Sequence, residues 1–199
     1  MALDRETLRT NFERHGFGVT FFDTADEARA YLCEQIRDTT VGIGGCATAV
    51  QMGLAEALGA NNTVYTHAIT NTRETRMAET NAEAFVCSAN GVSLTGELVN
   101  IDGMGNRVAA TLFGPERVFF VIGANKVEPT LEKALWRARN VASPKNAQRL
   151  GRKTPCAAKG DRCYDCKSPA RICRGLSVFW RCPSGSDIEI VLINEDLGY

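Results

Sequence analysis

Four of the eight cysteines lie in one short stretch of the chain, with the spacing C-x6-C-x2-C-x6-C. This stretch, residues 154–174, is rich in Gly, Pro, Lys and Arg, and its apolar residues follow neither the period of a strand nor that of a helix. Burial of an apolar face therefore does not explain how it is ordered. Four thiolates on a zinc ion or on an iron–sulfur cluster, for example 4Fe–4S, would hold it in place. We predict such a metal centre at Cys156, Cys163, Cys166 and Cys173.

Two other states of these cysteines stay open, two disulfides or four free thiols. The first residues, MALDRETLRTNFERHG, are typical of a polar amphipathic helix and not of a signal peptide. No apolar run has the length that a membrane span requires. We therefore expect a cytoplasmic protein in a reducing compartment, which favours the metal centre over disulfides.

A glycine turn at residues 42–48, with the sequence GIGGCAT, is the first candidate for a ligand pocket. It joins an expected strand to an expected helix, so main-chain N–H groups and the positive helix end meet at one point and favour an anion. The spacing fits neither a dinucleotide fingerprint nor a phosphate loop. We predict that Gly44, Gly45, Cys46 and Thr48 bind a small carboxylate, phosphate or acyl ligand. Cys46 is also a weak candidate nucleophile, although a small buried residue at a tight turn is the simpler interpretation.

Residues 90–107 are the second candidate, because Asn, Ser, Thr, Glu, Asp and Arg lie there between glycines directly after an expected strand. Ligands of open α/β sheets gather beyond the carboxyl ends of strands. We predict that Asn90, Glu97, Asn100 and Arg107 face the same ligand, with Glu97 a second weak catalytic candidate. A simple hairpin with Gly and Asn in its turns is the competing interpretation. The two histidines, His15 and His67, are isolated, so neither a histidine metal site nor a Ser–His pair is expected.

The elements that must position these residues alternate between strand and helix over the first ninety residues, which predicts a parallel sheet. Closely spaced strands are then expected at 92–94, 98–101, 108–113 and 117–122, followed by helices at 129–142 and 144–150. A last strand pair is expected at 176–180 and 188–194. The fold class is therefore α/β, a mainly parallel sheet flanked by helices, with an irregular Cys-rich segment near the C-terminus. We expect one domain over residues 1–199, with 154–174 as a metal-binding insertion.

Positive charge is concentrated around the cysteines. Residues 145–182 hold ten Lys and Arg against two Asp and Glu, although the whole chain is balanced at 23 of each. This basic region indicates an anionic ligand, an acidic partner or compensation for a thiolate–metal centre, and a solvated basic loop accounts for it equally well. Nucleic acid is disfavoured because Tyr164 is nearly the only aromatic side chain among these charges. The polar ending at 194–199 is expected to reach a pocket or an interface in a homo-oligomer.

The sequence resembles the LUD-domain family, also described as lactate-utilisation protein C-like or YkgG-like, over nearly the whole chain. The resemblance is carried by TGELVNIDG at 95–103 with GNRVA at 105–109, by residues 154–173, and by EDLG at 195–198. It implies the NagB/RpiA/CoA-transferase-like fold, with the 42–48 turn as a substrate-binding glycine loop. It departs from the family at Leu94, where an acidic residue is expected, and at Cys46, where serine is more usual.

The resemblance also implies a function. Proteins of this family accompany iron–sulfur partners in the oxidation of lactate to pyruvate. The leading hypothesis is a protein that binds a small carboxylate or acyl ligand, carries the four-cysteine centre and takes part in organic-acid oxidation. One alternative is a non-catalytic subunit with a structural zinc staple and a basic surface for an acidic partner. Another is a transferase or hydrolase that acts through Cys46 or Glu97.

Overall fold

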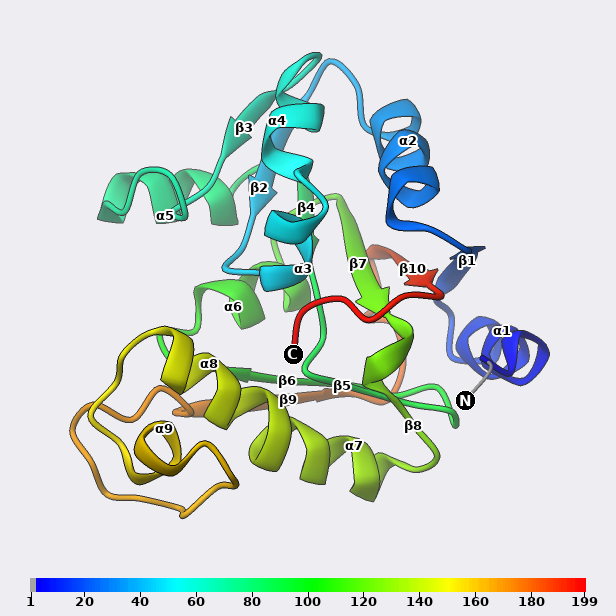
Figure 1. Ribbon diagram of the computed structural model, residues 1–199. Coiled ribbons are helices and arrows are strands. Elements are labelled where there is room, and N and C mark those ends of the chain that lie inside the picture. Colours follow the sequence, from blue (N-terminus) through cyan, green and yellow to red (C-terminus); the bar gives the residue numbers. More distant parts are fainter. Residues whose placement is uncertain (1–2) are drawn as a thin grey trace.

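The computed structural model describes residues 3–199, which form two β-sheets with helices around them (Figure 1). The larger sheet has six strands in the order β1-β10-β7-β4-β2-β3, and all of its neighbours are parallel. The smaller sheet has the order β8-β5-β6-β9 and is mixed. The strands are β1 (Gly18–Phe22), β2 (Thr40–Ile43), β3 (Thr63–Tyr65), β4 (Ala84–Cys87), β5 (Gly91–Ser93), β6 (Leu98–Asp102), β7 (Arg117–Gly123), β8 (Val127–Glu128), β9 (Gly175–Phe179) and β10 (Asp187–Ile193).

The helices cover both sheets, and several begin at a side chain that caps the first turn. Thr24 accepts a hydrogen bond from the Glu27 main-chain N–H, and the Glu27 carboxylate returns to the Thr24 main chain, which is a capping box. The helices are α1 (Arg5–Arg14), α2 (Ala25–Gln35), α3 (Ala47–Gln51), α4 (Leu54–Gly59), α5 (Arg73–Thr80), α6 (Asn106–Leu112), η1 (Ala124–Lys126), α7 (Leu131–Arg137), the π-helix η2 (Ala138–Ala142), α8 (Ser143–Arg149) and α9 (Pro155–Lys159).

The larger sheet is buried on both faces, which explains the unbroken apolar sequence of its central strands. On β7, Phe119 and Val121 pack with α2, α3 and α4, whereas Phe120 and Ile122 face the smaller sheet and α1. Each fully buried side chain of this size contributes about 2 kcal/mol to the free energy of unfolding. The prediction of a mainly parallel sheet flanked by helices is confirmed.

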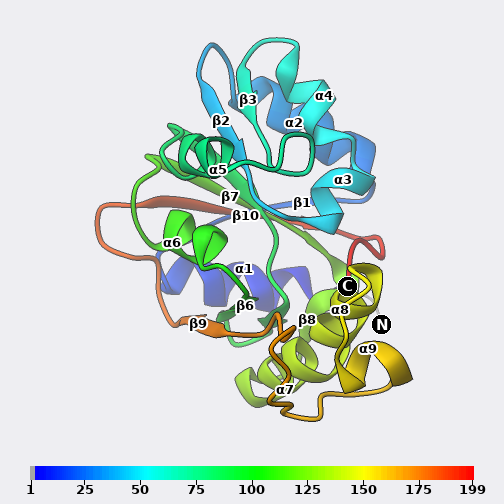
Figure 2. The same ribbon diagram turned by 90° about the vertical axis from the view of Figure 1, so that its left-hand side faces the viewer.

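The smaller sheet lies below the larger one in both views, and α7 covers its outer face (Figures 1 and 2). Leu98 of β6 and Phe179 of β9 join the core between the sheets, while Val99 faces the other way and packs on Ala134 of α7. The period-2 alternation along β6 thus buries one set of side chains in each layer. Helix α1 packs into the same core through Leu8 and Phe12.

The expected pairing of the last two strands is wrong. Strand β9 pairs with β6 at the edge of the smaller sheet, whereas β10 lies between β1 and β7 in the larger sheet. The compositions explain the difference, because β10 is almost continuously apolar and is buried on both faces, whereas β9 is half exposed.

The expected strand at 108–113 is also wrong, since these residues belong to helix α6. A short apolar run does not distinguish a buried strand from a buried helix. Asp102 stabilises the start of the helix, because its carboxylate accepts hydrogen bonds from the main-chain N–H groups of residues 103, 104 and 108. The helix that Asp102 caps carries Arg107, which therefore points back toward the strand ends.

No helix within residues 3–199 is long and apolar enough to cross a membrane. The carboxyl ends of β2, β4 and β7 lie side by side in the larger sheet, above α8 and the edge of the smaller sheet (Figure 1). The chain ends in the same place, because its last residues run from β10 back to α3 and β7 (Figures 1 and 2). Main-chain turns and side chains from distant parts of the sequence therefore meet at this edge.

Candidate functional site

A pocket of about 290 Å3 opens where the parallel strands end. Its wall combines the glycine turn after β2, the turn after β4, the start of α6, the end of η1, helix α8 and the last residue of the chain. This is the edge at which open α/β sheets bind their ligands. Among its lining residues are Gly45, Cys46, His67, Ser88, Asn90, Asp102, Arg107, Lys126 and Tyr199.

Arg107 is the most fully hydrogen-bonded side chain of the pocket, and it is 9% exposed. Its Nη1 donates to the main-chain oxygen of Ser88 at 2.8 Å and to Asn100 Oδ1 at 3.1 Å. Its Nη2 donates to the main-chain oxygen of Ile101 at 2.7 Å and to Asn90 Oδ1 at 3.2 Å. All four acceptors are neutral. The guanidinium is thus fixed in position without losing its charge to a carboxylate.

Lys126 is the second buried cation, with only 3% of its surface exposed. Its Nζ donates to Ser88 Oγ at 2.7 Å and to Thr48 Oγ1 at 2.8 Å. Burial lowers the pKa of Lys126 from its ordinary value to about 8, while the nearby Cys46 thiol acts in the opposite direction. The amine therefore loses its proton more readily than an ordinary lysine, and it lies within hydrogen-bond distance of two hydroxyl groups.

The end of the chain closes the pocket over Lys126. The main-chain N–H of Leu197 donates to Asn125 Oδ1 at 3.2 Å, and that of Gly198 donates to Gln51 Oε1 at 2.6 Å. A Cβ on Gly198 would lie 2.9 Å from Lys126 Nζ, so only glycine lets the backbone pass this close. The sequence predicts that the polar ending reaches a pocket or an oligomer interface, and Tyr199 lines this pocket.

His67 enters the pocket from the segment after β3 and is held by a buried carboxylate. Its Nδ1 lies 2.8 Å and 2.9 Å from the two oxygens of Glu79, which is 1% exposed. The other ring nitrogen faces the glycine turn, because a Cβ on Gly45 would lie 3.0 Å from His67 Nε2. Glu79 thereby fixes the ring so that Nε2 is directed at the pocket.

The pocket carries an excess of positive charge. Arg76, Arg149 and Arg152 line it in addition to Arg107 and Lys126, and Asp102 is the one acidic side chain among its lining residues. The Asp102 carboxylate already accepts three main-chain N–H groups of the α6 turn. Within residues 3–199, no carboxylate forms an ion pair with any of these five cations. Buried cations without a counter-ion favour an anionic ligand.

The structure brings most of the predicted ligand-binding residues together. Gly45, Cys46, Asn90 and Arg107 line the pocket. Gly44 lies directly behind them, since a Cβ there would be 3.3 Å from the Arg107 side chain. Thr48 and Asn100 are fully buried in a second layer, where Thr48 contacts Lys126 and Asn100 contacts Arg107.

The predicted position of Glu97 needs correction, because this residue does not line the pocket. It lies in the turn between β5 and β6, where its carboxylate accepts a hydrogen bond from Thr95 Oγ1 at 2.6 Å. That turn packs against α1 through Asn11 and His15, whose side chains contact the main-chain oxygens of Leu94 and Gly96. The hairpin interpretation of this segment applies to Glu97, whereas Asn90, Asn100 and Arg107 lie at the other end of the strands.

Sequence reasoning missed Ser88, Lys126 and the His67–Glu79 pair. Ser88 directly follows β4, and Lys126 follows the apolar strand β7, so the rule that strand ends carry functional residues could have found both. No sequence signal pairs His67 with Glu79, which lie twelve positions apart across a turn and most of α5.

The cysteine segment is ordered mainly by arginine side chains that bind main-chain oxygens. Arg171 donates to the oxygens of Cys166 at 2.9 Å and Cys173 at 2.8 Å, and its Nη1 lies 3.0 Å from Asp165. Arg174 donates to the oxygens of Arg171 and Pro169. These hydrogen bonds lie within residues 165–174, and Ser168 Oγ joins this half of the segment to its start by donating to the main-chain oxygen of Lys153 at 2.8 Å. The sequence did not predict these bonds.

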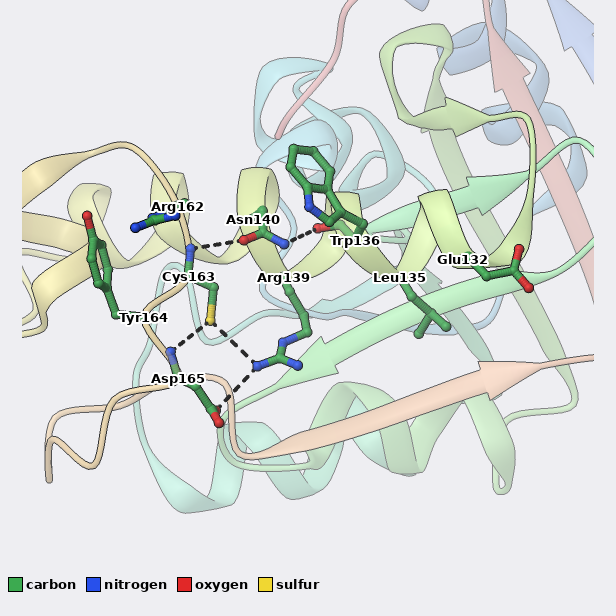
Figure 3. A pocket seen from close by; sticks show the side chains of 9 residues that line it. All are labelled: Glu132, Leu135, Trp136, Arg139, Asn140, Arg162, Cys163, Tyr164 and Asp165. Atoms are coloured by element: carbon green, nitrogen blue, oxygen red, sulfur yellow. Dashed lines mark hydrogen bonds and ion pairs between the residues drawn. The ribbon is translucent and has the colours of Figure 1, made fainter.

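Figure 3 shows an open groove of about 640 Å3 between this segment and the helix formed by α7 and η2. Cys163 points into it, and its Sγ accepts hydrogen bonds from the Asp165 main chain at 3.4 Å and from Arg139 Nη2 at 3.9 Å. Arg139 also forms an ion pair with Asp165 at 3.3 Å. Trp136 borders the groove and is 58% exposed.

The four thiols, as arranged, do not fit a four-ligand metal centre. No three His, Cys, Asp or Glu side chains of the described residues lie close enough together to hold a metal ion. Cys163 and Cys173 border one hollow of about 260 Å3, and Cys156 and Cys166 are not among the residues that line it. The four-cysteine centre therefore stays a prediction, and we derive no chemical step through it.

Fold and pocket together define the class, an α/β protein with a cationic pocket at the carboxyl edge of a parallel sheet. The family model described as the LUD domain matches residues 5–193, nearly the whole chain, so the protein belongs to the LUD domain family. A crystal structure of a DUF162 family protein from Deinococcus radiodurans shares the fold, with a TM-score of 0.52. It is 15% identical and covers 96% of this chain and 99% of its own. The search of curated proteins finds no match.

Proposed function

We propose that the pocket binds a small organic anion, a carboxylate or acyl compound, and that the protein takes part in the oxidation of lactate or a related organic acid. The observation that carries this proposal is the pair of buried cations, Arg107 and Lys126, neither of which has an ion-pair partner within residues 3–199. The link to organic-acid oxidation rests on membership of the LUD family, which is associated with lactate utilisation.

The contacts of Arg107 indicate how the anion would be held. Its four hydrogen bonds to neutral acceptors use both hydrogens of Nη1 and both of Nη2, which leaves the Nε–H for a ligand. Hydrogen bonds between charged groups are about twice as strong as neutral ones. Arg76, Arg149 and Arg152 at the mouth would attract the anion from solution.

Equilibrium binding tests this proposal. We would titrate the wild-type protein with L-lactate, pyruvate and inorganic phosphate by calorimetry, and use lactamide as a neutral analogue of lactate. We expect a carboxylate to bind and lactamide not to bind. Arg107→Met should weaken binding about tenfold or more, while Arg139→Met, a control in the groove of Figure 3, should bind as the wild type does.

Two outcomes would contradict the proposal. One is equal affinity for lactate and lactamide, which would show that the negative charge of the ligand does not contribute to binding. The other is unchanged carboxylate affinity in a folded Arg107→Met variant. A four-cysteine iron–sulfur or zinc centre and an iron–sulfur redox partner are separate proposals, supported by the cysteine spacing and by the family rather than by this pocket.

A further inference from the structure

We propose that Ser88 and Lys126 form a nucleophilic pair that transfers an acyl group from an anionic thioester or ester. This inference rests on the proposed function, because the carboxylate of the substrate would be held by Arg107. It goes beyond anion binding in assigning a reaction and two catalytic residues to the pocket.

The geometry of the pair is that of a hydroxyl nucleophile beside an amine base. Lys126 Nζ and Ser88 Oγ lie 2.7 Å apart, within the distance that proton transfer requires. Both residues line the pocket, and Ser88 is 4% exposed, so it is largely shielded from bulk water. Serine–lysine pairs are one of the recurring solutions for nucleophilic catalysis.

The surroundings of Lys126 hold it in place and reduce its charge. Thr48 Oγ1 accepts a second hydrogen bond from Nζ at 2.8 Å and donates to the main-chain oxygen of Leu197, so Thr48 is a positioning residue. Burial lowers the pKa of Lys126 to about 8, which leaves a useful fraction of neutral amine at mildly alkaline pH.

Arg107 connects this pair to the bound anion. Its Nη1 donates to the main-chain oxygen of Ser88 at 2.8 Å and both residues line the pocket, so an anion held by the guanidinium would share one cavity with the serine. An acyl carbon attached to that anion could then approach Ser88 Oγ. The substrate class is thus a small acyl thioester or ester that carries a carboxylate.

The reaction balances without an oxidant or a metal. Neutral Lys126 takes the Ser88 hydroxyl proton while Oγ forms a bond to the carbonyl carbon. The carbon–sulfur or carbon–oxygen bond of the substrate breaks, and the leaving group takes the proton from the Lys126 ammonium. Water then gives its proton to Lys126 and attacks the Ser88 ester, and the serine oxygen leaves and recovers the proton.

Intact-protein and peptide mass spectrometry test this proposal. The probe would be S-acetyl-3-mercaptopropionate, a small anionic thioester, with S-acetyl-N-acetylcysteamine as its neutral counterpart. We expect one acetyl group per chain on the peptide that carries Ser88, and faster labelling by the anionic probe. Ser88→Ala and Lys126→Met should each lower the labelling rate at least a hundredfold, whereas Ser93→Ala, at a buried serine outside the pocket, should not.

Mapping of the acetyl group keeps the test decisive even if a variant folds poorly. Labelling of Cys46 or of Lys126 itself, with Ser88 unmodified, would overturn the assignment. So would equal labelling of wild type and Ser88→Ala. If carboxylates bind but Ser88 is not acetylated, this inference fails and the proposed function stands. If the neutral probe acetylates Ser88 and no carboxylate binds, the nucleophilic pair stands and the proposed function fails.

Discussion

The pocket at the strand ends and the cysteine segment are both rich in cationic side chains, but they use them differently. In the segment, Arg171 and Arg174 donate to main-chain oxygens of their own loop and act as cross-links. In the pocket, Arg107 and Lys126 are held by neutral groups, and no carboxylate of residues 3–199 forms an ion pair with either of them. Positive charge thus serves to order a loop in one region and to attract an anion in the other.

The two regions also differ in the size and the chemistry of their hollows. The groove beside Cys163 is the larger, about 640 Å3, but it is open, and its Arg139 forms an ion pair with Asp165. The pocket of about 290 Å3 holds two buried cations and an oriented histidine. Perturbed titratable groups in a recess identify a functional site better than volume does.

Metal content is the test with the largest expected effect, because it decides whether the cysteine segment also carries chemistry. If the predicted centre forms, anaerobically purified protein should contain iron with matching sulfide, or zinc, near one centre per chain. Cys163→Ser/Cys166→Ser should lose it, since two of the four thiolates are removed. Elemental analysis and a visible spectrum measure this outcome. Metal-free protein in both preparations would contradict the predicted centre and would leave hydrogen bonds, mainly those of Arg171 and Arg174, to order the loop.

Arg107→Met should give the largest effect in the pocket. The substitution removes a donor from two main-chain oxygens and two side-chain oxygens, so we expect a loss of about 3 kcal/mol in the free energy of unfolding, measured by urea denaturation. Arg139→Met, which removes an exposed arginine of the groove, should cost less than about 1 kcal/mol. An equal loss of unfolding free energy in both variants would contradict the view that Arg107 is held more firmly than the arginines around the groove.

Lys126→Met should test the contrast between the pocket and the cysteine segment through the pH dependence of the free energy of unfolding. Because the folded-state pKa of Lys126 is about 8 and the ordinary value is 10.5, the unfolded chain binds more protons between these values. The wild type should therefore gain stability as pH rises from about 8 to 10.5, by on the order of 3 kcal/mol. The charged or titratable groups that face it are Cys46, Cys87, Arg107 and Arg137.

The variant lacks this ionisable group, so the free energy of unfolding of the wild type minus that of Lys126→Met should rise by the same amount between about pH 8 and pH 10.5. Urea denaturation of both proteins at closely spaced pH values measures it. A pH-independent difference would mean that Lys126 titrates normally and would weaken its role as a base.

Arg171→Ala should have the smallest effect on the free energy of unfolding, and its effect should be confined to the cysteine segment. We expect faster cleavage within residues 160–174 by a protease that does not cleave after Arg or Lys, because the main-chain oxygens of Cys166 and Cys173 lose their donor. Carboxylate binding should change less than twofold. The control is Arg174→Ala, which removes the donor to Pro169 and should give a similar but weaker result. Loss of carboxylate binding in Arg171→Ala would show that the two regions are coupled.

The sequence by itself determined the parallel core, because the alternation of apolar strands with capped helices has one compact solution. It also located the glycine turn and Arg107, since both follow strand ends where ligands of such sheets gather. Its errors were of two kinds, because the pairing expected for the last two strands was wrong in sheet topology, whereas the strand expected at 108–113 was a local error. The run at 108–113 suited a strand or a helix equally well, and the Asp102 carboxylate stabilises the helix by accepting a hydrogen bond from the main-chain N–H of Val108.

The tertiary structure alone decided which side chains share the pocket. Ser88, Lys126 and Thr48 are separated by up to 78 positions, yet sheet order brings their atoms within hydrogen-bond distance. Glu97 is close in sequence to Asn100 and lies at the opposite end of the hairpin. The physical reason is that neighbours in a parallel sheet are set by strand order, and strand order depends on the packing of the whole core rather than on any local pattern.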